Sequence, residues 1–237
     1  MDLSEIPIID HHAHSLLRPE TTHDPVGFQR WFTESVDPQV HARDVPHSLV
    51  FRTGVRWLAE LLDCAPTLEA VLAARLAQPY EAWTRRLFQE ANISLLLCDY
   101  GYQSSQAYSH TELQALLPCR VEPMLRLETL AEQLIVQSDT FAQLIEAFVA
   151  SVGQARADGY VALKSIVAYR TGLDVLPTSS AEAAAAFQPL KAEARRAGQV
   201  RLASKALNDY LIGLALEQAA LQELPVQFHT GFGDRDA

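Results

Sequence analysis

The sequence predicts an α/β protein whose parallel β-sheet is covered by helices on both faces. Short apolar runs, each long enough for one strand, recur along the chain, and longer segments with apolar residues at helical spacing separate them. This alternation is typical of doubly wound folds and of (β/α) barrels. In both architectures the functional side chains gather at the carboxyl ends of the strands.

Length and charge narrow the possible functions. The chain has 237 residues, 49% of them hydrophobic, which is enough for one large domain or two small ones. A formal net charge of −10 argues against nucleic acid as a partner. No apolar stretch approaches 18 residues, and the acidic N-terminus is unlike a secretory signal, so we expect a cytoplasmic protein that makes no membrane contact. The widely spaced Cys64, Cys98 and Cys119 predict reduced thiols rather than disulfides.

The first predicted strand is an apolar run at residues 6–9 that leads into Asp10-His11-His12-Ala13-His14. Side chains two residues apart on a strand share a face, so we expect His12 and His14 to project together, with Asp10 beside them. Two imidazoles at this spacing can bind one metal ion. A strand end that is merely polar and solvated is the alternative interpretation.

The next predicted element is a helical insertion at about residues 20–90 that covers the site. Nearly all of this stretch has helical spacing, and it is far longer than an ordinary connection between a strand and the next helix. His23, Arg52, Arg56 and Trp57 are its candidate substrate contacts, although solvated helix surface is the more common role of such residues.

From Asn92 onward, strands and helices alternate. Strands are expected at residues 93–99 and 120–127, and an amphipathic helix at 141–157 ends at Asp158-Gly159. Asp99, Arg126 and Glu128 lie near the carboxyl ends of these strands and are candidate site residues on that ground alone.

The fourth predicted strand, residues 160–170, carries one charged residue, Lys164, in the middle of an apolar run. A buried, unpaired lysine costs several kcal/mol, so Lys164 must be paired, deprotonated, modified or directed into a polar cavity. A structural ion pair is one interpretation. The functional one places Lys164 in the same cavity as His12 and His14, as a catalytic base, a contact for a substrate carboxylate or a carboxylated metal ligand. Arg170, which follows the run, is a candidate for binding an anionic substrate.

Two helices, residues 180–196 and about 200–222, precede a fifth predicted strand at 224–229 that ends in His229. A second apolar strand therefore delivers an imidazole at its carboxyl end. Three histidines on two such strands, with a lysine on a third, predict a metal site formed by His12, His14 and His229.

Three segments carry a more specific pattern in combination: residues 9–14 (IDHHAH), 163–173 (LKSIVAYRTGL) and 227–234 (QFHTGFGD). In these segments the chain resembles the amidohydrolase superfamily, in the amidohydrolase-related branch. That branch includes aminocarboxymuconate-semialdehyde decarboxylase-like enzymes, uronate isomerases and amidohydrolase-like domains fused to glutamine synthetases.

The resemblance implies a distorted (β/α)8 TIM-barrel-type fold, with residues 1–237 forming a single incomplete barrel domain. It implies that His12, His14 and His229 bind a divalent metal, usually zinc. The strand-six histidine and strand-eight aspartate of the family have no counterpart, because the sequence stops just past the fifth strand. We therefore expect a barrel that ends after strand five in this sequence. Either the chain is the N-terminal part of a larger one, or a homo-oligomer or a second polypeptide supplies the missing strands.

The function implied is metal-dependent hydrolysis of a small, anionic substrate through a metal-activated water. Nonoxidative decarboxylation or isomerisation in the same fold is one alternative. A catalytically silent barrel fragment that serves as a binding or regulatory domain is another, because the strand-eight aspartate has no counterpart.

Overall fold

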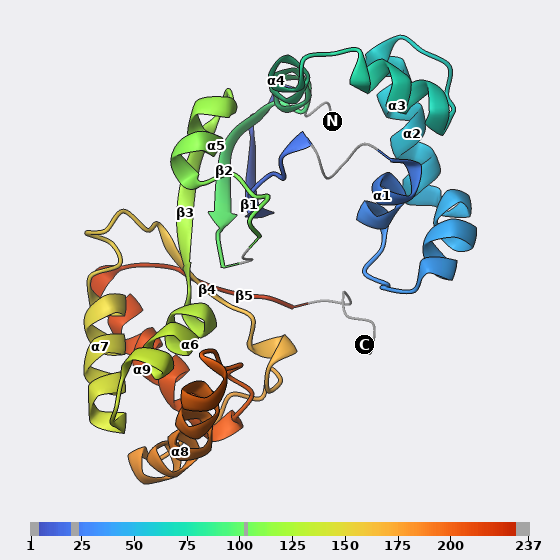
Figure 1. Cartoon of the computed structure of the whole chain (residues 1–237). Helices are drawn as coiled ribbons and strands as arrows, with labels where there is room; N and C mark the ends of the chain where they lie inside the picture. The colour runs from blue at the N-terminus through green and yellow to red at the C-terminus, as the bar shows by residue number, and fades with distance from the viewer. Residues whose placement is uncertain (1–4, 20–23, 102–103, 231–237) are drawn as a thin grey trace.

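The computed structural model describes residues 5–19, 24–101 and 104–230 (Figure 1). Within these ranges, five parallel strands form one sheet in the order β1-β2-β3-β4-β5. The strands are β1 (Ile8–His14), β2 (Ile93–Asp99), β3 (Arg120–Arg126), β4 (Ala162–Ser165) and β5 (Val226–Phe228). Because all five run in one direction, their carboxyl ends lie at one edge of the sheet, where functional side chains gather.

Helices occupy the connections between strands. Between β1 and β2 lie α1 (Pro25–Gln29), α2 (Leu49–Leu62), α3 (Leu68–Leu76) and α4 (Tyr80–Glu90), with the short turns η2 (Arg30–Phe32), η3 (Val40–Asp44) and η4 (Val45–His47). The later connections contain α5 (His110–Leu116), α6 (Leu127–Gln137), α7 (Phe141–Gly153), η5 (Val167–Tyr169), α8 (Ser180–Ala197) and α9 (Lys205–Gln222). Figure 1 shows α1–α3 gathered on one side of the sheet and α6–α9 on another.

Side-chain caps fix where several helices begin. The hydroxyls of Ser48 and Thr67 accept hydrogen bonds from the first turns of α2 and α3. Ser109, Thr140 and Ser179 form capping boxes with the third residue of α5, α7 and α8. Such caps satisfy backbone N–H groups that the helix leaves unpaired, so these starts could be predicted from sequence.

The buried apolar residues form separate clusters. The largest lies where α6–α9 pack against β4, and Phe148, Leu163 and Phe187 are among its members. A second cluster holds α1–α3 together around Phe28 and Phe51. The α1–α3 segment therefore has a core of its own, which lets it carry side chains toward the site as an ordered unit.

The expected (β/α)8 barrel, truncated after strand five, is wrong as a description of this fold. The described strands form a five-stranded, all-parallel sheet that curls into a half-barrel (Figure 1). The alternation of strands and helices predicts a parallel sheet, but strand number and closure depend on tilt and stagger between strands, which that alternation does not encode. The fourth strand is also shorter than predicted, because the chain leaves the sheet after Ser165 and forms η5.

Strand β1 is irregular at the predicted metal motif. Its pairing with β2 shifts register between Asp10 and Ala13. A register shift of this kind interrupts the simple alternation of side chains between the two faces of a strand. The carboxylate of Asp10 accepts a hydrogen bond from the backbone N–H of His12 at 3.1 Å. Asp10 therefore braces the bulged strand.

No helix in the described part of the chain combines the length and apolar character needed to cross a membrane.

Candidate functional site

A cavity of about 600 Å³ lies at the carboxyl ends of β1, β4 and β5. Its lining includes His12 and His14 from β1, Lys164 from β4 and His229, which directly follows β5. The predicted metal ligands and the predicted catalytic lysine thus line one cavity. The other lining residues are Ser15, Leu17, Arg30, Trp31, Thr33, Glu34, Arg126, Ile166 and Tyr169.

His12 and His229 form the centre of this cavity. The Nε2 atom of His12 lies 3.2 Å from Nδ1 of His229, and the two rings meet edge to face with centroids 4.9 Å apart. The backbone N–H of His229 donates to the carbonyl of Ser165 at 2.9 Å, which anchors this histidine to β4. Burial lowers the pKa of both imidazoles, and the nearby charge of Lys164 lowers each pKa further. Neutral imidazole is the form that binds metals.

Lys164 is buried and lies beside His12. Its Nζ atom is 3.4 Å from Nε2 of His12, and it donates a short hydrogen bond to the side-chain oxygen of Gln227. The Gln227 amide in turn donates to the backbone carbonyl of His11 at 2.7 Å. Burial lowers the pKa of the Lys164 amine. Lys164 therefore makes its described polar contacts with neutral partners and forms no ion pair with a described residue.

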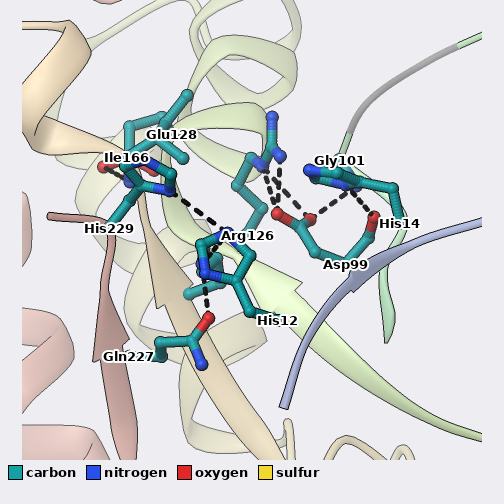
Figure 2. A network of polar contacts seen from close by, with 10 residues as sticks. His12, His14, Asp99, Gly101, Arg126, Glu128, Ile166, Gln227 and His229 are labelled. Carbon is teal, nitrogen blue, oxygen red and sulfur yellow. Dashed lines mark hydrogen bonds and ion pairs between the residues drawn. The ribbon is translucent and has the colours of Figure 1, made fainter. Parts of the chain in front are cut away.

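His14 contacts the end of β2. Its Nδ1 atom lies 3.0 Å from the backbone carbonyl of Asp99. If Nδ1 carries the proton and donates it to this carbonyl, the ring has its lone pair on Nε2. Figure 2 shows His14 beside Asp99, on the opposite side of His12 from His229. His14 lines the same cavity as His12 and His229, and its charge acts on both of their rings.

No group of three or more His, Cys, Asp or Glu side chains in the described ranges is arranged to hold a metal ion. The geometry offers two close imidazole nitrogens, with a third imidazole in the same cavity.

Asp99 and Arg126 form a buried ion pair at the ends of β2 and β3. Nε of Arg126 donates a hydrogen bond to Oδ2 of Asp99 at 2.9 Å, and Nη2 of Arg126 donates one to the same oxygen at 2.5 Å (Figure 2). Asp99 also accepts the backbone N–H of Gly101 at 2.8 Å. The arginine lines the cavity, whereas the carboxylate is enclosed beneath it. Both were candidates from position alone, and the sequence did not indicate that they pair.

Glu128 is buried at the start of α6. Its Oε1 accepts hydrogen bonds from the hydroxyl of Ser165 at 2.6 Å and from the N–H of Ile166 at 3.1 Å, while Oε2 has no hydrogen-bond partner among the described residues. Burial raises the pKa of this carboxyl, and the two hydrogen bonds oppose the rise. Glu128 therefore braces the bend at which the chain leaves β4, and it does not line the cavity.

Arg170, the predicted substrate contact, does not line the histidine cavity. Its guanidinium lies 3.2 Å from Glu132 on α6. It lines a neighbouring cavity of about 390 Å³, and Arg126 belongs to the lining of both cavities. The ion pair with Glu132 could not be predicted, because the two residues are brought together only by the packing of α6 against the loop after β4.

The helical segment contributes different residues from those predicted. Arg52, Arg56 and Trp57 lie on α2 and do not line the cavity, and His23 lies outside the described residues. Arg30, Trp31 and Glu34 line it instead. Trp31 is 55% exposed, which is unusual for a large aromatic ring in a packed segment. A tryptophan directly after Arg30 and three residues before Glu34 was the available signal.

Tyr169 is a further residue that the sequence did not single out. Its hydroxyl lies 2.5 Å from Nε2 of His229, and the two rings are 4.6 Å apart. The residue belongs to η5, the turn that replaces the predicted end of the fourth strand. A tyrosine in an apparent apolar strand gave no sign that it faced a histidine from β5.

The chain is similar to two known proteins. It is 28% identical to Protein fluG of Emericella nidulans over 265 aligned positions, which cover 97% of this chain and 30% of that protein. It is 33% identical to the crystal structure of a "putative metal-dependent hydrolase" from Lactobacillus casei, with a TM-score of 0.84, covering 100% of this chain and 62% of that one. No protein-family model matches the sequence. The chain thus spans less than two thirds of either relative, and the resemblance to the amidohydrolase superfamily stays a prediction.

Proposed function

We propose that this protein is a metal-dependent hydrolase that acts on a small anionic substrate. The observation that carries the proposal is the 3.2 Å separation of Nε2 of His12 and Nδ1 of His229 in the wall of an open cavity. Two nitrogens that each bind a tetrahedral ion at about 2.0–2.1 Å are roughly 3.3 Å apart, so this spacing fits one shared ion. The similarity to a structure described as a metal-dependent hydrolase supports the same reaction class.

Zinc is the ion we propose, because imidazole nitrogens are among its preferred ligands. His12 and His229 are the primary proposed ligands. His14 is the third, since a hydrogen bond from Nδ1–H to a backbone carbonyl is the arrangement that orients a metal-binding histidine. When bound, the ion would lower the pKa of a water molecule and polarise a substrate carbonyl.

Lys164 is the proposed proton acceptor. Its amine lies in the cavity wall beside His12, and burial lowers its pKa toward the range in which an amine accepts protons. The Gln227 oxygen accepts a hydrogen bond from Nζ and fixes the position of the amine. In this role Lys164 would take the proton released by the attacking water, and it would hold that proton next to the proposed metal ligands.

An anionic substrate is supported by the charges around the cavity. Although the chain carries a formal net charge of −10, Arg30 and Arg126 line this cavity against a single lining carboxylate of the described residues, Glu34, while Asp99 pairs with Arg126 beneath the cavity wall. Arg30 makes no ion pair with any residue in the described ranges, so its charge is available to a ligand. Arg170 stays a proposed contact for a substrate group that reaches the neighbouring cavity.

The test is a hydrolysis screen of zinc-loaded protein against small esters, amides and lactones that carry a carboxylate, alongside uncharged analogues. We expect turnover that favours the carboxylates, stops on chelation, returns with zinc and is lost in His229→Ala. His47→Ala is the matched control, because His47 is exposed and lies outside the cavity. Turnover that survives chelation would contradict the proposal. Zinc and carboxylate binding without turnover would favour a silent binding domain.

A further inference from the structure

Tyr169 contacts the one ring nitrogen of His229 that does not face His12. The hydroxyl lies 2.5 Å from Nε2, whereas Nδ1 is 3.2 Å from His12 (Figure 2 shows His229 and His12). The two neighbours of His229 therefore divide its ring nitrogens between them. A neutral imidazole carries one proton, so the partner of each nitrogen decides which of them can offer a lone pair.

Tyr169 is itself held by backbone contacts. The turn η5 is closed by hydrogen bonds from Tyr169 N–H to the Ile166 carbonyl and from Arg170 N–H to the Val167 carbonyl, both at 2.9 Å. Arg201 donates to the Tyr169 carbonyl at 3.2 Å from the loop before α9. Because its backbone is fixed at several points, the ring can position its neighbour.

We propose that Tyr169 is a positioning residue that makes Nδ1 the metal-binding atom of His229. The inference rests on the proposed function, since it assigns the donor atom of a proposed ligand. In the metal-bound state, Nε2–H donates to the Tyr169 oxygen and the lone pair on Nδ1 faces the ion shared with His12. A ring rotated by half a turn would lose the Tyr169 contact and would place the carbon Cδ2, which cannot bind a metal, where Nδ1 now faces His12.

A hydrogen-bonded partner on the far nitrogen of a ligating histidine typically contributes about 10- to 100-fold to metal affinity. We therefore expect Tyr169→Phe to weaken zinc binding by about 10- to 100-fold in a competition titration with a chromophoric chelator. Tyr160→Phe is the matched control, because Tyr160 lines a different cavity and its hydroxyl makes no hydrogen bond with the described residues. It should bind zinc like the wild type.

A second measurement separates positioning from a general structural effect. Long-range ¹H–¹⁵N spectra of the zinc-loaded wild type should show a proton on Nε2 of His229, slow to exchange with solvent, and metal on Nδ1. In Tyr169→Phe the same proton should exchange faster while the backbone spectrum is kept.

The outcomes of these measurements are distinguishable. Zinc on Nε2 in the wild type would overturn the proposal, as would unchanged affinity and proton exchange in Tyr169→Phe. A wild type that binds no zinc would instead refute the proposed function, and the role of Tyr169 with it.

Discussion

Nε2 of His12 and Nδ1 of His229 lie 3.2 Å apart, although β1 and β5 are the two edges of the five-stranded sheet. The curl of the sheet brings its edges within side-chain reach of one another. Gln227 of β5 adds a second bridge, because its amide donates to the carbonyl of His11 on β1. The curvature of the sheet and the candidate site are thus the same structural feature.

The ion pair between Asp99 and Arg126 predicts a large loss of stability when it is broken. Asp99→Asn keeps the shape of the side chain and an acceptor for Gly101, but leaves the largely buried Arg126 without its counter-charge. Removing one partner of a buried pair costs about 3–5 kcal/mol, which urea unfolding can measure. Glu60→Gln, in the exposed Arg56–Glu60 pair, should cost about 1 kcal/mol or less. Equal effects of the two substitutions would show that burial does not strengthen the first pair.

Glu128 predicts a specific dependence of stability on pH. Burial raises the pKa of its carboxyl above the ordinary value of 4.5. The folded state therefore binds this proton more tightly than the unfolded state. The stabilisation of the folded state by protonation of Glu128 is complete below pH 4.5, and it is lost as the pH rises through the folded pKa of this carboxyl. The Glu128→Gln variant has no carboxyl group that loses a proton. Its free energy of unfolding, relative to that of the wild type, should therefore increase as the pH rises from 4.5 through the folded pKa of Glu128. A constant difference in unfolding free energy between pH 4 and pH 8 would contradict this account.

The charge of Lys164 should affect the pKa values of His12 and His229 in the metal-free protein. Burial lowers the pKa of His12 and of His229, and the charge of Lys164 lowers both further. Lys164→Met should therefore raise both pKa values, as followed by NMR titration of the ring resonances. Unchanged values would mean that the Lys164 amine is already neutral at the pH of the titration.

Removing the charge of Glu34 should change the pKa of His229 in the opposite direction. Its charge raises the pKa of His229, against the larger lowering by burial. Glu34→Gln should lower the pKa of His229 further, as measured by the same titration. Glu146→Gln, an exposed carboxylate on α7, is the control and should leave it unchanged. A rise in the His229 pKa would show that Glu34 does not act on this ring through its charge.

Much of the fold could be predicted from local patterns. The apolar run at residues 93–99 matches β2 residue for residue, and the predicted helix at 180–196 differs from α8 by one residue. These elements follow from hydrophobic periodicity and capping. The number of strands and the openness of the sheet depend on geometry between distant segments, and there the eight-stranded expectation was wrong.

The site was predictable where it depends on strand ends. His12, Lys164 and His229 line one cavity because parallel strands end at the same edge of the sheet. The side-chain contacts that the sequence did not predict join residues that are distant along the chain. Glu132 engages Arg170, Asp99 holds His14, and Tyr169 faces His229. The alternation of side chains along one strand does not indicate which distant residues will pair. It also does not indicate the register shift in β1.

The central claim is that His12 and His229 share a metal ion, and zinc content after equilibrium dialysis measures it most directly. We expect about one zinc ion per wild-type chain, with His47→Ala unchanged and with zinc lost from both His12→Ala and His229→Ala while the fold is kept. Retention of stoichiometric zinc by either variant, or its absence from the wild type, would contradict the claim.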